Sequence, residues 1–199
     1  MPEAIISLVT ASALLLGSPG PATLGLAAVG AVFGIQQGLR FLAGILTGLG
    51  AAILGASLGL AALFAAFPTA RVTVQLIGGL YIGYIAFKVA TAPHATDSAT
   101  VRQTPPGFMD GFLINLLNPK AYAVLLALFS QFLLPLTSSA GAYAATALVC
   151  FVVGIIVDII WLGFGSMLRP LFKQPRPARV LRVLFAVLMV GSVIWAYAQ

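Results

Sequence analysis

Charge is scarce in this sequence. Only 7% of its 199 residues are Asp, Glu, Lys or Arg, whereas 61% are hydrophobic, and the mean hydropathy is +1.10. Soluble domains of this size carry about a quarter charged residues. The chain has too little polar surface to cover a soluble globule, so the composition argues against soluble enzymes and indicates an integral membrane protein.

Cysteine and histidine each occur once. The lone thiol, Cys150, cannot form an intramolecular disulfide or a two-cysteine redox centre, which argues against a membrane thiol-redox enzyme. His94 lies in a polar stretch and has no second histidine with which to share a metal ion, whereas a metal-ion exporter would need several intramembrane ligands. No G-x-x-x-x-G-K-[ST] phosphate loop occurs. We therefore expect no metal site, no cofactor and no enzymatic activity.

The few charges are mostly basic, with a formal net charge of +6 and a pI near 10.0. Lys and Arg accumulate in the cytoplasmic loops of membrane proteins, so we expect no nucleic-acid partner. The N-terminus carries Glu3 in place of a basic n-region, and the sequence around Pro19 is a poor signal-peptidase site. The first apolar segment is therefore expected to remain in the mature protein.

Apolar stretches long enough to cross a bilayer recur along the chain. We predict six transmembrane segments, at about residues 4–29, 41–67, 72–89, 108–134, 142–167 and 180–198. A polar linker at about 92–107 divides the single domain, residues 1–199, into repeat one (about 1–91) and repeat two (about 108–199). Repeats with an odd number of spans insert with opposite orientations. The expected fold is an all-α integral membrane protein built from two inverted three-helix repeats.

Proline motifs interrupt the first and fourth segments. These are Ser18-Pro19-Gly20-Pro21 and Asn118-Pro119-Lys120. Proline supplies no amide donor and clashes with the preceding turn, so helices 1 and 4 should break there. Freed backbone groups inside a membrane are tolerated only where they are buried in protein or line a polar cavity. Breaks at corresponding positions of two repeats indicate a binding site near the middle of the bilayer.

Two ionisable side chains, Lys120 and Asp158, are expected within the membrane, where charge is costly and functional roles are common. Lys120 would offer a cation to an anionic substrate group, and Asp158 would bind an ammonium or exchange a proton. The alternative is that the two form a structural ion pair.

The breaks themselves supply partial charges. The half-helix after a break presents N–H groups that suit a carboxylate, and the half-helix before it presents carbonyls that suit an ammonium. Ser18 and Asn118 would add hydrogen bonds at N-cap-like positions. Together these features predict a site for a small solute that carries both charges.

The basic residues are distributed unevenly between the loops. Arg71 alone is expected on one side of the membrane. Loops one, three and five would hold the eight others outside the membrane core: Arg40, Lys88, Arg102, Arg169, Lys173, Arg176, Arg179 and Arg182. This asymmetry predicts that loops one, three and five are cytoplasmic and that both termini lie outside the cytoplasmic (inner) membrane.

Glycine and proline motifs occur in order along the first 140 residues or so. They are Ser18-Pro19-Gly20-Pro21, Gly38-Leu39-Arg40 with Gly44 and Gly48, Gly78-Gly79-Leu80-Tyr81-Ile82-Gly83, and Phe108, Gly111-Phe112, Asn115 and Asn118-Pro119-Lys120-Ala121. In this set the chain resembles the LysE/RhtB superfamily of amino-acid exporters. The resemblance fades toward the C-terminus, where the last span reads Arg182-Val183-Leu184-Phe185 and lacks an early glycine.

The resemblance implies proton-driven export of amino acids or close derivatives across the cytoplasmic membrane, by a homodimer. We expect alternating access, in which the two halves of the chain move about the central breaks. Asp158 matches no family motif, so its predicted ion-coupling role rests on burial alone. A metal-ion or other small-solute exporter and a non-transporting membrane scaffold remain alternatives. The predicted substrate-binding residues are Ser18, Pro19, Gly20, Pro21, Asn115, Asn118, Pro119 and Lys120.

Overall fold

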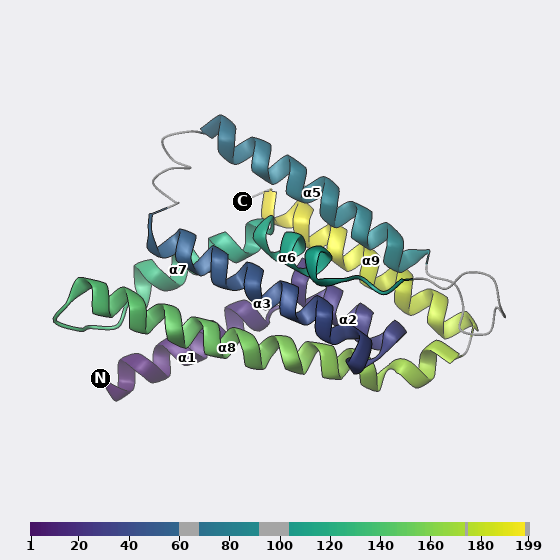
Figure 1. Cartoon of the computed structure of the whole chain (residues 1–199), viewed down its shortest axis with the longest axis horizontal. Coiled ribbons are helices and arrows are strands. Elements are labelled where there is room, and N and C mark those ends of the chain that lie inside the picture. Colours follow the sequence, from purple (N-terminus) through teal and green to yellow (C-terminus); the bar gives the residue numbers. More distant parts are fainter. Residues whose placement is uncertain (60–67, 92–103, 174, 198–199) are drawn as a thin grey trace.

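Every regular element in the described part of the chain is a helix. The computed structural model describes residues 1–59, 68–91, 104–173 and 175–197 (Figure 1). Most of the predicted polar linker, including His94, and the end of the second predicted segment lie outside these residues. The helices are α1 (Pro2–Gly17), α2 (Pro21–Phe33), α3 (Ile35–Ser57), α5 (Pro68–Ala90), α6 (Phe108–Leu116), α7 (Pro119–Gln131), α8 (Ser139–Met167), the 3-10 helix η1 (Arg169–Lys173) and α9 (Pro175–Tyr197).

The lengths and apolar character of these helices fit a membrane protein. Three of them, α3, α8 and α9, are long and apolar enough to cross a bilayer singly. The pairs α1–α2 and α6–α7 qualify only as bent pairs, with bends of 64° and 56°. The described residues therefore hold up to five candidate spans. The apolar stretch of α5, Leu76–Ala90, occupies the place of the third predicted segment but is shorter than a full span.

Both predicted breaks are present, and proline explains where the chain resumes its helix. Pro21 and Pro119 each stand in the first turn of the second half-helix, where the missing amide has no partner to lose. Lys120 consequently belongs to the first turn of α7 rather than to the break itself. A further interruption falls at Gly34, whose φ of 83° is a conformation that other residues rarely adopt.

Glycines allow two helix pairs to pack with their backbones in contact. Helix α3 runs along α6, and α2 runs along α8. A Cβ added at Gly44 would lie 1.9 Å from the Phe108 carbonyl oxygen, and one at Gly165 would lie 2.0 Å from that of Ala27. Any side chain at these positions would force the helices apart. The third long contact joins α5 and α9. In Figure 1 these two helices lie at the upper right, and α8 lies along the bottom.

Buried apolar side chains form two clusters that flank the breaks. One joins α2, the start of α3, the end of α5, α6, the end of α8 and α9, and the other joins α1, the end of α3, α7 and the start of α8. One face of α8 is exposed and apolar, as expected of a lipid-facing surface. It consists of Leu148, Val152, Ile156, Ile159 and Ile160.

Candidate functional site

The first break exposes the carbonyl end of α1. The Ser18 hydroxyl donates to the Leu15 carbonyl oxygen at 2.8 Å, and the Trp161 indole N–H donates to that of Gly17 at 3.1 Å. Ser18 therefore caps the C-terminus of α1 and does not act as the predicted N-cap. The physical reason is position: α2 begins only at Pro21, so the N-cap is Gly20.

A threonine that was not predicted completes the start of α2. The Gly20 amide donates to Thr23 Oγ1 at 2.9 Å. This is the backward half of a capping box, in which the third residue of a helix binds the N-cap amide. Thr23 lies three residues after Gly20, which is the spacing of a capping box, so the sequence could have identified it. Trp161 was also missed, although it lies three residues after Asp158 and therefore on the same side of α8.

Asparagines organise the second break. The Asn118 side chain accepts a hydrogen bond from the Lys120 amide at 3.1 Å, so its predicted N-cap role is confirmed. Asn115 is buried, and its amide donates to the Ile45 carbonyl oxygen at 3.0 Å, which fastens α6 to α3. The Tyr122 hydroxyl donates to the Leu116 carbonyl oxygen at 2.7 Å. Side chains thus satisfy the carbonyl end of α6, as they do that of α1.

Lys120 connects the two breaks. Its ammonium donates a short hydrogen bond to the Ser18 carbonyl oxygen and lies 3.5 Å from that of Pro19. The side chain crosses directly over Gly20, where an added Cβ would lie 2.7 Å from Lys120 Cδ. Gly20 has a φ of −165°, extended backbone that any residue can adopt. The absence of a side chain at Gly20 therefore serves to make room for the lysine.

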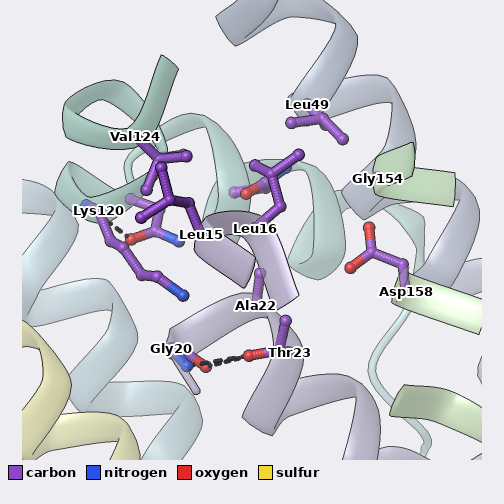
Figure 2. Close-up of a pocket in the computed structure, with 13 residues that line it drawn as sticks. Leu15, Leu16, Gly20, Ala22, Thr23, Leu49, Lys120, Val124, Gly154 and Asp158 are labelled. Atoms are coloured by element: carbon purple, nitrogen blue, oxygen red, sulfur yellow. Dashed lines mark hydrogen bonds between the residues drawn. The ribbon is translucent and has the colours of Figure 1, made fainter. Parts of the chain in front are cut away.

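A pocket with a cavity volume of about 40 Å³ lies between the breaks. Asp158 is only 6% exposed and lines this pocket across from Lys120, as Figure 2 shows. In the described part of the chain, no carboxylate lies within 4.0 Å of the Lys120 ammonium, so the two residues do not form a direct ion pair. The remaining walls are mainly apolar: Leu15, Leu16, Ala22, Leu49, Ala121, Val124 and Gly154.

The predicted residues fall into two groups. Gly20, Asn115, Asn118, Lys120 and Asp158 line the pocket together with Thr23. The others, Ser18, Pro19, Pro21 and Pro119, are absent from the pocket wall and shape the breaks instead. Within the described ranges, no group of three or more His, Cys, Asp or Glu side chains gathers in a geometry that could hold a metal ion.

The chain is similar to known proteins over almost its whole length. A sequence profile described as LysE type translocator matches residues 13–194. The chain belongs to the LysE family. Members of this family are efflux transporters and not enzymes. The profile covers both breaks, Asp158 and nearly all of the last helix, so the similarity extends beyond the motifs seen in the first 140 residues or so.

Several efflux proteins are similar to this chain. The homoserine/homoserine lactone efflux protein of Salmonella typhimurium is 27% identical over 188 residues, which cover 92% of this chain and 91% of the relative. The cysteine/O-acetylserine efflux protein of Salmonella choleraesuis is 26% identical over 174 residues, 87% of each chain. Its counterpart in Escherichia coli O1:K1 is 27% identical over 176 residues. No solved structure matches the chain.

Proposed function

We propose that this LysE-family protein exports small amino acids or close derivatives by secondary active transport. The observation that carries the proposal is the hydrogen bond between the two breaks, from Lys120 to the Ser18 carbonyl oxygen, beside a pocket that Asp158 lines. Broken helices that meet near the middle of a membrane are the usual setting for a transport site. A scaffold protein would gain nothing from burying two ionisable groups there.

The chemistry of the relatives' substrates narrows the class. Homoserine, cysteine and O-acetylserine are small and have uncharged side chains, and homoserine lactone shares their primary amine but has no free carboxylate. The pocket here is small and its walls are mainly apolar. We propose an uncharged, small side chain and a primary ammonium as the features of the substrate.

The helix contacts support two inverted three-helix repeats. In the proposed repeats, α1 corresponds to α6, α2 to α7, α3 to α8 and α5 to α9. Under this correspondence the α1–α7 contact becomes the α2–α6 contact, and the α3–α6 contact becomes the α1–α8 contact. Both members of each pair are present, and the α3–α8 and α5–α9 contacts map onto themselves. The α2–α3, α2–α9 and α5–α6 contacts have no counterpart of comparable extent, so the pattern fits a two-fold axis between the repeats in part.

The helices pack more closely in the half of the bundle near the proposed cytoplasmic loops than in the opposite, outer half. This difference supports alternating access. Backbones touch at Gly44 and Gly165, both in the half that ends in the proposed cytoplasmic loops. In the opposite half, a Cβ added at Gly17 would lie at an ordinary 3.7 Å from Val157. We propose that the cytoplasmic half is closed in this conformation and that the outer half, around α1 and α7, opens more easily.

Proton coupling is proposed for Asp158. It is the buried carboxylate at the pocket, and no hydrogen bond to it is present among the described residues. An intramembrane acid of this kind suits a proton exchange site. The protein would lie in the cytoplasmic membrane, with loops one, three and five inside. A homodimer is proposed on the family resemblance alone.

Export by variants tests the proposal. Cells that overproduce the protein are loaded with dipeptides, and the amino acids that appear outside are measured. We expect wild type and Lys88→Ala, which removes a lysine outside the pocket, to export, and Lys120→Ala and Pro19→Leu to fall to the background of cells without the protein. All variants should insert in the membrane in equal amounts. Normal export by Lys120→Ala or Pro19→Leu would show that the site is misplaced.

A further inference from the structure

The carbonyl oxygens at the end of α1 form a ready site for a cation. The last carbonyls of a helix lack intrahelical partners and carry the negative end of the helix dipole. Neutral donors satisfy two of them, since the Ser18 hydroxyl binds the Leu15 carbonyl and the Trp161 indole binds that of Gly17. The next two carbonyls, of Ser18 and Pro19, face the Lys120 ammonium. The cationic position at this end is thus held by a side chain from the other repeat.

Gly20 is adapted to this occupant. A Cβ at position 20 would approach the Lys120 ammonium to 3.0 Å as well as crowding its Cδ. By contrast, a Cβ at Gly163 of α8 would have nothing within 4 Å among the described atoms. Alanine at position 20 would therefore displace the lysine without any need to change the backbone.

Of the described groups around the pocket that could accept a cation, only one has a cation in direct contact. Two positions could accept a cation, the Ser18 and Pro19 carbonyl oxygens and the Asp158 carboxylate. The carboxylate lines the pocket, and the carbonyl oxygens lie just behind its wall, in contact with the ammonium of Lys120, which lines it. Lys120 is the cation at the first position and is not within 4.0 Å of the second. A second ammonium group that enters the pocket would find either Asp158 or, if Lys120 moves, the carbonyls.

We propose that the Ser18 and Pro19 carbonyls are a primary-ammonium site that Lys120 occupies in this structure, and that the substrate's ammonium competes with Lys120 for it. The inference rests on the proposed function and assigns Lys120 the role of an internal competitor rather than a ligand of the substrate's anionic group. Lys120 lies on α7 and the carbonyls belong to the end of α1. Displacement of the lysine would therefore release one broken helix from the other, and Asp158 lies across the same pocket to receive it.

Chemical complementation tests the carbonyl site. Purified Lys120→Ala is titrated with propylammonium while its thermal unfolding is followed, with propanol as the uncharged probe. We expect saturable stabilisation by propylammonium alone, and none in wild type or Lys88→Ala, because Lys120 already fills the site there. If Lys120→Ala does not fold, Lys120→Ser, which also vacates the carbonyl oxygens, is used in its place. Equal stabilisation of all the proteins by propylammonium, or no stabilisation of the Lys120 variant, would overturn the proposed site.

Substrate binding tests the competition. When Lys120 occupies the site, only the fraction of protein molecules with a free site can bind substrate, and the apparent affinity for substrate falls by that fraction. Lys120→Ala should therefore bind radiolabelled L-homoserine or L-cysteine at least about threefold more tightly than wild type, although its export is lost. Equal or weaker binding would contradict the competition and favour a lysine that holds the substrate carboxylate. Absence of both binding and export in wild type would instead reject the proposed exporter, and the propylammonium result would still decide the carbonyl site.

Discussion

Asp158 is a buried carboxylate that has no direct hydrogen bond or ion pair among the described residues. Asp158 is almost fully enclosed, and an acidic group at the centre of a membrane helix costs about 2.5–3.5 kcal/mol on insertion scales. An ion pair with Lys120 would have reduced that cost, yet the lysine binds backbone carbonyls instead. The arrangement is understandable if Asp158 is kept available for a proton or an ammonium.

Replacement of Asp158 should separate transport from its driving force. Asp158→Asn keeps the size of the side chain but removes the exchangeable charge. We expect stimulation of export by an imposed pH gradient, measured in inside-out vesicles, to fall at least about tenfold. Glu3→Gln removes a carboxylate of the exposed first turn of α1 and should leave the stimulation unchanged. A normal response in Asp158→Asn would remove this residue from the coupling role.

At the level of helices, glycine decides which pairs approach closely. The α2–α8 contact is reciprocal, because a Cβ at Gly30 would lie 2.3 Å from the Leu162 carbonyl oxygen and one at Gly165 would lie 2.0 Å from that of Ala27. Membrane helices associate through such close packing, since lipid tails provide little hydrophobic drive. The same principle explains the α3–α6 pair. These contacts hold the half-helix after the first break and the half-helix before the second.

Alanine at two positions of α8 should distinguish close packing from helix propensity. Gly165→Ala inserts a methyl group into the α2 backbone and should destabilise the protein by about 1–3 kcal/mol, measured by denaturant unfolding in mild detergent. Gly163→Ala has free space and should be neutral or slightly stabilising, because alanine favours a helix by roughly 0.5–1 kcal/mol over glycine. Equal effects of the two substitutions would contradict the proposed contact.

On the scale of the whole molecule, the polar groups lie inside and the apolar surface faces outward. Asp158 faces the pocket, while Ile156 and Ile160, two positions away on either side, are exposed. A soluble protein would reverse this pattern.

The proposed orientation can be measured with single introduced cysteines. Cys150 is fully buried, so the native background should be low. Thr137→Cys, in the turn before α8, should react with a membrane-impermeant maleimide in intact cells. Gln36→Cys, at the exposed start of α3, should react only after the cells are permeabilised, because loop one is proposed to be cytoplasmic. The opposite labelling pattern would reverse the topology.

Much of the candidate site could be predicted from the local chemistry of the sequence. Proline at positions 19, 21 and 119 cannot propagate a membrane helix, so both breaks could be placed before the fold was known. The Asn118 cap follows from the same reasoning. The N-cap of α2 could not be predicted in the same way. The first break contains several candidate residues, and only the geometry selects Gly20 with Thr23.

The sequence by itself determined that this is a membrane protein of the LysE type with two broken helices and two ionisable residues among apolar ones. Only the tertiary structure decided what those residues contact. Lys120 could have paired with Asp158 or bound the Ser18 carbonyl, more than a hundred residues away. Every residue has a backbone carbonyl, so no side-chain pattern marks the one that becomes a partner. The packing of the two breaks, with no side chain at Gly20, selects it.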